Sequence, residues 1–330
     1  MRASLFGGPG MLPLLKLLQD GRFHSGEALG AALGVSRAAV WKQLQTLEAE
    51  LALPIHKVRG RGYRLASPLQ LLDEAAILSA QAPCSWPVRV LPVVDSTNAE
   101  ALRALQAGCE PPFVLLAERQ LAGRGRRGRA WVSPFAENLY YSLLLRVEGG
   151  VNRLDGLSLV VGLALLAALR ALGVSSAGLK WPNDVLVNGR KLAGILLELS
   201  GDPADVCHLV IGIGVNVNMQ PGVQAIDQPY TAICTELGHS LDRNQLAAQL
   251  NKQLQHYLAI HHERGFADLR EEWECNHLWQ GRAVTLSAGA GSVEGVVLGV
   301  DCTGAIRLDV EGVEQCFSGG ELSLRLRDDS

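Results

Sequence analysis

The stretch GRGRRGR, Gly123–Arg129, places four arginines among three glycines near the middle of a chain of 330 residues. Glycine lets backbone N–H groups converge on an anion, because it adopts conformations that other residues avoid. Arginine adds permanent positive charge and bidentate contacts to phosphate or carboxylate. The stretch therefore predicts a loop that closes on an anionic ligand. We expect the loop to be mobile without ligand and ordered with it, since four like charges repel one another and ordering glycines costs entropy.

Three other interpretations of this loop fail on its surroundings. Its glycines have the spacing of a dinucleotide-binding turn, but Pro134 interrupts the helix that should follow. A phosphate-binding P-loop needs Lys and then Ser or Thr after its last glycine, where this chain has Arg129 and Ala130. An RNA-binding Arg/Gly tract is long and repetitive, whereas this loop is short and lies between two apolar strands.

Three further motifs accompany the loop in order: DSTN at Asp95–Asn98, KWPND at Lys180–Asp184 and GRKLAGIL at Gly189–Leu196. With GRGRRGRAW at Gly123–Trp131 they resemble the biotin protein ligases. The resemblance runs from about residue 11 to Arg327. It implies an enzyme that makes biotinyl-5'-AMP from biotin and ATP and then transfers biotin to a lysine of a biotin carboxyl carrier protein, with the carrier of acetyl-CoA carboxylase as the expected acceptor.

The chemistry of that family calls for a strongly positive site. The biotin carboxylate attacks the α-phosphate of ATP, so two anions must be brought together away from water. The resemblance makes Lys191 and Arg126 the catalytic residues: Lys191 contacts the carboxylate and the phosphate, and Arg126 retains the adenylate. A free mixed anhydride would hydrolyse or acylate lysines at random. Mg²⁺ is expected with ATP, since it neutralises the triphosphate, and no dedicated protein cage for a metal is expected.

The resemblance also assigns contacts to biotin and adenine. The hydroxyl and amide groups of Ser96, Thr97 and Asn98 suit the ureido ring of biotin, which both donates and accepts hydrogen bonds. Gln120 lies near that ring in the family, and Trp131 packs over the adenine. The complete expected set of ligand contacts is Ser96, Thr97, Asn98, Gln120, Gly123, Arg124, Gly125, Arg126, Arg127, Trp131, Lys180, Asn183, Asp184, Lys191, Gly194, Asn216 and Arg325.

Several of these residues also have a purely structural interpretation, which the sequence leaves open. Ser96, Thr97 and Asn98 fit the N-terminus of a helix over 99–105. Trp131 fits ordinary core packing, and Asn216 fits the capping of a strand end. Asn183 and Asp184 are candidates for either the metal or the phosphate side of the site, and Lys180 for the phosphates.

The first fifth of the chain carries a different signature, that of a helix-turn-helix. Leu29 and Leu33 lie one turn apart, Gly34 ends their helix, and Ser36 is a plausible N-cap for the next helix. Two short helices about a tight glycine turn are typical of DNA-binding domains. The apolar side of the second helix recurs at helical spacing at Val40, Leu44 and Leu47.

A basic hairpin follows this motif over Pro54–Pro68, where apolar residues alternate around Gly60-Arg61-Gly62. Its basic residues have no acidic neighbour in the sequence, as expected of a DNA-binding wing; they are Lys57, Arg59, Arg61 and Arg64. Trp41 stands where a polar DNA-facing residue is expected, and the sequence does not decide whether it faces DNA or the core. The expected DNA contacts are Ser36, Arg37, Lys42, Gln45, Arg59 and Arg61.

The helix-turn-helix makes the chain resemble the bifunctional kind of biotin ligase, which is also the biotin operon repressor. That resemblance implies operator DNA as a partner and a homodimer that biotinyl-AMP promotes. Palindromic operators bind two such modules, which also favours a dimer.

These motifs must be positioned by helices and strands. The order of the helices and strands expected from the sequence predicts an α+β multidomain fold. We expect a winged helix-turn-helix in residues 1–67, a ligase domain in 68–277 and a small SH3-like β-barrel in 278–330. By resemblance the ligase domain has the mixed sheet of class II synthetases. Its expected elements are helices near 71–80, 157–172 and 244–259, a Pro-rich passage at 83–92, and strands at 113–120, 138–146, 184–187, 193–199 and 209–217.

The composition limits the classes of protein to which this chain can belong. The net charge of −3 means that any anion or nucleic-acid site is a local patch. The most apolar run, Leu157–Leu169, is shorter than the roughly 20 residues that span a bilayer, so no membrane partner is expected. Seven cysteines without a C-x-x-C pair predict reduced thiols and a cytoplasmic protein.

Three rival functions remain as alternatives. A lipoate–protein ligase shares the fold class, but GRGRRG and KWPND favour biotin. A regulator that senses a ligand without catalysis would not need Lys191 and the arginines. A ligase whose N-terminal domain no longer binds DNA would not need the basic wing.

Overall fold

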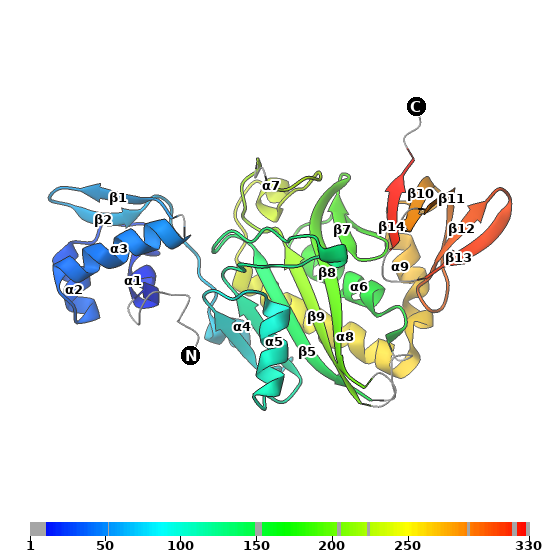
Figure 1. Ribbon diagram of the computed structural model, residues 1–330, viewed down its shortest axis with the longest axis horizontal. Coiled ribbons are helices and arrows are strands. Elements are labelled where there is room, and N and C mark those ends of the chain that lie inside the picture. Colours follow the sequence, from blue (N-terminus) through cyan, green and yellow to red (C-terminus); the bar gives the residue numbers. More distant parts are fainter. Residues whose placement is uncertain are drawn as a thin grey trace.

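The computed structural model describes residues 11–51, 53–148, 154–202, 206–222, 225–288, 291–318 and 322–327. Three groups of elements follow one another along the chain. Figure 1 shows the N-terminal group as a lobe at one end of the molecule, joined to the central group by a short extended stretch. Phe135 and Ala136 of the central group pack in the same core cluster as the lobe.

The N-terminal group is a winged helix-turn-helix, as predicted. Gly34 ends its second helix in the left-handed conformation, at φ 66°. The Ser36 hydroxyl accepts a hydrogen bond of 3.2 Å from the backbone N–H of Ala39 and so begins the third helix. The elements are α1 (Met11–Leu18), α2 (Gly26–Leu33), α3 (Arg37–Leu51), β1 (Ile55–Val58) and β2 (Gly62–Leu65).

The central group is built on a seven-stranded sheet. Every neighbouring pair of strands is antiparallel except the first pair, which is parallel. Across the sheet the strands run β3 (Val88–Leu91), β4 (Phe113–Ala117), β5 (Leu139–Val147), β9 (Cys207–Val215), β8 (Arg190–Gly201), β7 (Asp184–Val187) and β6 (Ala177–Lys180).

Helices cover both faces of this sheet. Alternate residues of β4 show the two faces: Val114 and Leu116 belong to the main core, whereas Phe113 and Leu115 pack in a smaller cluster with α5. The main face carries α6 (Leu157–Ala171) and α8 (Arg243–Arg264), and the other carries α5 (Thr97–Gln106). The remaining helices are α4 (Glu74–Ala80), α7 (Ile233–Leu237), α9 (Arg270–Asn276) and the short 3-10 helices η1 (Arg126–Gly128) and η3 (Phe266–Leu269).

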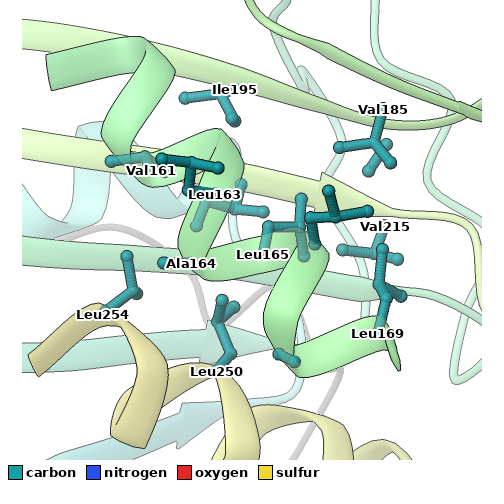
Figure 2. Packing of buried hydrophobic residues seen from close by; sticks show 14 of the residues in the cluster. Val161, Leu163, Ala164, Leu165, Leu169, Val185, Ile195, Val215, Leu250 and Leu254 are labelled. Carbon is teal, nitrogen blue, oxygen red and sulfur yellow. The ribbon is translucent and has the colours of Figure 1, made fainter. Parts of the chain in front are cut away.

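The main core is a sandwich of sheet, α6 and α8. Figure 2 shows side chains of α6 between Val185, Ile195 and Val215 of the sheet and Leu250 and Leu254 of α8. From Leu159 to Leu169 every residue of α6 is apolar, because the helix is covered on two sides. This packing holds the strands that carry the functional motifs in fixed register.

The C-terminal group is the expected small β module. Its five antiparallel strands lie in the order β13 (Val313–Phe317), β12 (Ile306–Val310), β11 (Gly291–Val300), β10 (Ala283–Ala288) and β14 (Leu322–Leu326). Its buried residues, such as Val284 and Leu324, join the main core of the central sheet. The module is therefore packed directly against the central group.

Some element predictions were wrong at their limits. The Pro-rich passage contains β3, an edge strand, which is the place where prolines are tolerated beside a sheet. The helix expected near residue 71 begins only at Glu74, because the Asp73 carboxylate caps it through the Ala76 N–H at 2.8 Å. Strand β6 and helix α9 had no prediction, and α8 extends five residues beyond the expected end at residue 259.

A buried ion pair fixes the stretch that joins the winged helix to the sheet. Arg243 at the start of α8 lies 2.7 Å from Glu118, and both side chains are at most 3% exposed. The guanidinium also donates to the backbone carbonyl of Gln70 at 2.5 Å. The Glu118 carboxylate accepts the backbone N–H of Leu72 at 2.6 Å. The linker is thus tied to the end of β4 and to α8.

Candidate active site

The predicted ligand-contact residues converge on one cleft of about 720 Å³. It is lined by the N-terminal end of α5, the Gly/Arg loop, the 180–184 segment, β8, β9 and β14. Every residue of the expected set lines it except Gly123. Gly123 lies behind the loop, where a side chain would meet the Trp131 carbonyl and Gln120. The binding roles themselves stay predictions.

One end of the cleft holds a network of hydrogen-bonded polar side chains. The Ser142 hydroxyl donates to Asn98 Oδ1 at 2.6 Å, and Asn98 Nδ2 donates to Glu198 Oε2 at 2.7 Å. The backbone N–H and the hydroxyl of Thr97 both donate to Gln120 Oε1, at 2.9 and 3.1 Å. Ser96 occupies the N-cap position of α5 but makes no capping hydrogen bond with its side chain. The hydrogen bonds hold Thr97, Asn98 and Gln120 in fixed orientations at this end of the cleft.

The other end concentrates positive charge around one carboxylate. Lys191 Nζ lies 2.7 Å from Asp184 Oδ1, and Lys180 Nζ lies 3.6 Å from Asp184 Oδ2. Burial lowers the pKa of Lys180, and the neighbouring Lys191 lowers it further, while Asp184 opposes both effects. Two lysines share one aspartate here, so the cluster keeps a net positive charge for an incoming anion.

Arg126 joins this cluster from the Gly/Arg loop. Its guanidinium donates to Asn183 Oδ1 at 3.0 Å and to the Leu322 carbonyl of β14 at 3.3 Å. Burial lowers the pKa of Arg126, with Asp184 opposing the shift, but an arginine remains charged near neutral pH. The loop, the 180–184 segment and the C-terminal module therefore meet at one arginine.

The loop itself forms a narrow turn. The backbone N–H of Gly125 donates to the Arg129 carbonyl at 2.7 Å, and Arg127 adopts the left-handed conformation at φ 59°. Arg124 is exposed and pairs with Glu198 at 3.0 Å, next to Asn98. The expected ordering of this loop by ligand stays a prediction.

Trp131 forms a wall between the two ends of the cleft. Its indole lies so close to β9 that a side chain at Gly214 would collide with the ring. Lys191 Nζ lies 5.6 Å from the ring centroid, a cation–π distance. The indole N–H is buried without a hydrogen-bond partner among the described residues. This placement fits both packing and a contact with a bound ligand.

Asn216 and Arg325 border the charged end. The Asn216 amide donates to the Thr231 carbonyl at 3.0 Å, which supports its structural interpretation, yet the residue also lines the cleft. Arg325 lies on β14, and its charge helps to lower the pKa of Lys180. The C-terminal module thus contributes a cation to the cleft.

Sequence reasoning missed several residues of the cleft. Glu198 connects Asn98 to Arg124, and Gly212 leaves room for the Asn98 amide. The alternating glycines of IGIG were an available signal, because glycine inside a strand marks a close approach. The segment 225–230 also lines the cleft. It contacts Lys191, whose backbone N–H donates to the Pro229 carbonyl at 2.9 Å. No pattern in the sequence pointed to that segment.

The predicted DNA contacts all lie on the exposed surface of the winged helix. Arg61 and Arg64 stack on the ring of Phe23, at 4.3 and 5.0 Å from its centroid. The wing has no acidic neighbour in the sequence, but in the structure Lys57 pairs with Glu48 of α3 at 2.9 Å. The pair forms only when the hairpin folds back on the helix. The predicted contacts are Ser36, Arg37, Lys42, Gln45, Arg59 and Arg61.

Among the described residues, no group of three or more His, Cys, Asp or Glu side chains is placed to hold a metal ion. None of the helices in the described ranges is long and apolar enough to cross a bilayer. The seven cysteines are all free.

Two family descriptions match the chain. The "Biotin/lipoate A/B protein ligase family" matches residues 90–216, and "HTH domain" matches residues 12–64. The cleft's motifs fall within or beside the first range, and the winged helix fills the second.

Individual relatives agree with these matches. The "Bifunctional ligase/repressor BirA" of Escherichia coli (strain K12) is 42% identical over 95% of this chain and 97% of its own length. The "Biotin--[acetyl-CoA-carboxylase] ligase" of Paracoccus denitrificans is 39% identical over 69% of this chain and 96% of its own. The solved structure of the biotin protein ligase from Aquifex aeolicus in complex with biotin and ATP is 31% identical, with a TM-score of 0.65 over 73% of this chain and 99% of that one. The chain therefore belongs to the biotin protein ligase family, among the bifunctional ligase/repressor proteins that carry an N-terminal helix-turn-helix domain.

Proposed function

We propose that this protein joins biotin and ATP into biotinyl-5'-AMP and transfers the biotinyl group to a lysine of a biotin carboxyl carrier protein. The observation that carries the proposal is the division of one cleft into an end built on a hydrogen-bonded network, whose one carboxylate is paired with Arg124, and a cationic end, with Trp131 between them. A heterocycle with a carboxylate tail fits this division. The ring binds near Asn98 and Thr97, and the tail reaches Lys191.

The residues of the cleft have separate tasks in this reaction. Lys191 holds the carboxylate and the α-phosphate together by offsetting their mutual repulsion, and Lys180 binds the phosphates of ATP. Arg126 closes the loop over the mixed anhydride by bridging Asn183 and β14, which shields it from water. The attacking amine comes from the carrier protein, so no nucleophile of this chain is required.

Mg²⁺ enters this site with ATP. Asp184 is a carboxylate in the cleft that fits beside a metal–phosphate complex, although two lysines already share it. A bound Mg²⁺ supplies neutralisation of the triphosphate and of the departing pyrophosphate. The side chains that would hold the ATP phosphates around it are Lys180, Lys191 and Arg126.

The direct test is transfer of radiolabelled biotin to a biotin carrier domain in the presence of MgATP. We expect label on the carrier only when biotin, MgATP and this protein are all present. Labelled lipoate in the same assay tests the nearest rival activity, that of a lipoate–protein ligase. No biotin transfer, with biotin binding intact, would point to a ligand-sensing regulator without catalysis.

Replacing Arg126 by glycine is expected to release the adenylate. The variant loses the guanidinium's hydrogen bonds to Asn183 and to the Leu322 carbonyl. A hydrogen bond of a charged donor is worth roughly 1.5–3 kcal/mol, so dissociation of biotinyl-AMP should rise at least tenfold. Escaped adenylate should label lysines of a bystander such as serum albumin. Arg126→Lys keeps the charge without the planar fork and should give an intermediate rate. Equal bystander labelling by wild type and glycine variant would contradict this role.

We also propose that the protein represses biotin synthesis genes as a dimer on operator DNA. The second half of β8, residues 195–201, pairs with β9 on one side and with no strand of the described ranges on the other. Leu199 in this half is 46% exposed. A second copy can extend the sheet along this edge, and Arg124–Glu198 links the same strand to the Gly/Arg loop. Filling the cleft would then favour dimerisation.

Sedimentation velocity at micromolar protein checks this coupling. We expect the sedimentation coefficient to rise toward that of a dimer when biotin and MgATP are added. ATP without biotin is the control. An unchanged coefficient with both substrates would refute the coupling, whereas loss of biotin transfer would refute the ligase reaction.

The domain limits proposed from the sequence are 1–67, 68–277 and 278–330. They are supported by the end of β2 at Leu65 and the start of β10 at Ala283. A cytoplasmic location is part of the same proposal, and the free cysteines are compatible with it.

A further inference from the structure

Trp41 is a large apolar side chain on the outer face of the recognition helix α3. It is 48% exposed, whereas Val40, Leu44 and Leu47 of the same helix are completely buried. Its indole makes none of the ring or cation–π contacts found among the described residues. The structure thus places Trp41 on the surface, and the core does not need it.

The surroundings of Trp41 are basic and polar. One helical turn before it lies Arg37, the next residue is Lys42, and one turn after it lies Gln45, all of them exposed. Residues 11–67 hold eight Lys or Arg against four Asp or Glu, a formal balance of +4 in a chain whose net charge is −3. An apolar ring framed by positive charge fits a partner that is anionic and offers small apolar groups between its charges.

Duplex DNA meets both conditions. Its phosphates match the basic frame, and the major groove presents the C5-methyl group of thymine among polar base edges. The N-terminal half of a recognition helix is the part that enters the groove, and Trp41 is the fifth residue of α3. An acidic protein would match the charge, but Trp41 stands between Arg37, Lys42 and Gln45 on the recognition helix of a helix-turn-helix, the element that enters the major groove.

We propose that Trp41 packs against a thymine methyl group in the major groove and so determines part of the operator sequence. The inference rests on the proposed repressor function and names the base group that this helix reads. Arg37 and Lys42 hold the backbone on either side, and Gln45 remains free to bond a base edge. Removing the indole should therefore relax specificity without removing the electrostatic part of binding.

The first experiment selects binding sites from random duplex DNA with full-length protein, biotin and MgATP. Wild type is expected to enrich a two-fold motif with a fixed thymine in each half-site. Trp41→Ala should enrich the same motif with that thymine lost. Leu78→Ala, which removes a 43% exposed apolar side chain from α4, is the matched control and should keep the thymine.

The second experiment replaces the selected thymine by uracil, which removes only the methyl group. The affinity of wild type should fall about fivefold, and that of Trp41→Ala should not change. Affinity for random-sequence DNA should stay within about twofold for both proteins. Biotin transfer should be the same in both, which shows that the variant is folded.

The outcomes separate the two proposals. A wild-type motif that Trp41→Ala preserves, or an equal effect of uracil on both proteins, overturns the role of Trp41 alone. Failure of the wild type to select any motif, with biotin transfer intact, overturns the repressor function and this inference with it. Equal weakening of Trp41→Ala on all sequences would make Trp41 a nonspecific contact and also overturn the inference.

Discussion

Replacing Lys191 by methionine is expected to slow the formation of biotinyl-AMP by about 10²–10³-fold, a loss of roughly 3–4 kcal/mol of transition-state stabilisation. Methionine keeps most of the apolar stem and removes the charge. That charge lies 2.7 Å from Asp184 and against the face of Trp131, at the boundary between the two ends of the cleft. It is therefore placed where the carboxylate meets the α-phosphate.

The measurement is pyrophosphate release in a single turnover, with biotin binding followed separately. Since the charge acts mainly on the transition state, we expect the rate to fall much more than the affinity for biotin. Lys180→Met is the matched control: Lys180 lies farther from Asp184, at 3.6 Å, and stacks on Trp279 instead. Its expected effect is on the KM for ATP.

Two results would contradict the assignment. If Lys180→Met lost the chemical step and Lys191→Met kept it, the two lysines would have exchanged roles. If Lys191→Met lost biotin binding as completely as turnover, Lys191 would be a binding residue without a preference for the transition state. Asp184→Asn adds a check, because it frees both lysines and should alter the affinity for ATP.

The fold was largely predictable because its signals are local. Gly34 and Ser36 fix the turn between α2 and α3 through their own backbone and side-chain preferences, and the structure confirms both. The apolar stretch of α6 is long enough to identify a buried helix. The β3 strand was missed because four residues flanked by prolines carry little pattern of their own. Its existence depends on pairing with β4, a contact that lies far away in the sequence.

Residues of the site could be predicted only where they belong to a recognisable sequence motif. The sequence motifs named Lys180, Asp184 and Lys191, and the structure brings these residues together. Glu198 was missed because its role comes from register: β8 places it beside Asn98, one hundred residues away. A charged residue in an apolar strand looks like a solvated position until its neighbour across the fold is known.

The exposure of Trp41 is another feature that the sequence alone could not predict. Helical periodicity alone left two faces open for it, because tryptophan suits a core as well as an interface. Only packing decides, since Val40, Leu44 and Leu47 already fill the inner face. The sequence could not decide whether Trp41 faces DNA or the core. The structure shows that it does not face the core.

Replacing Arg243 by methionine is expected to lower the free energy of unfolding by about 3–5 kcal/mol, because it leaves the buried Glu118 carboxylate without its counter-charge. The change also removes the donor to the Gln70 carbonyl, so the linker loses one of its anchors. Urea unfolding followed by circular dichroism should show a lower midpoint. A matched control is Arg307→Met, which breaks an exposed pair with Glu314 and should cost under about 1 kcal/mol.

A second variant separates the ion pair from simple loss of packing. Arg243→Met combined with Glu118→Gln removes both charges, while the glutamine oxygen still accepts the N–H of Leu72. The double variant should recover roughly 1–3 kcal/mol relative to Arg243→Met alone, since the cost lies in an unpaired buried charge. No recovery would mean that packing around the arginine stem carries the effect.

Because this pair anchors the linker, Arg243→Met should also weaken the coupling of biotinyl-AMP to DNA binding more than it weakens biotin transfer at the same temperature. Equal losses in both assays would show that the pair stabilises the ligase fold as a whole and has no particular part in connecting it to the winged helix.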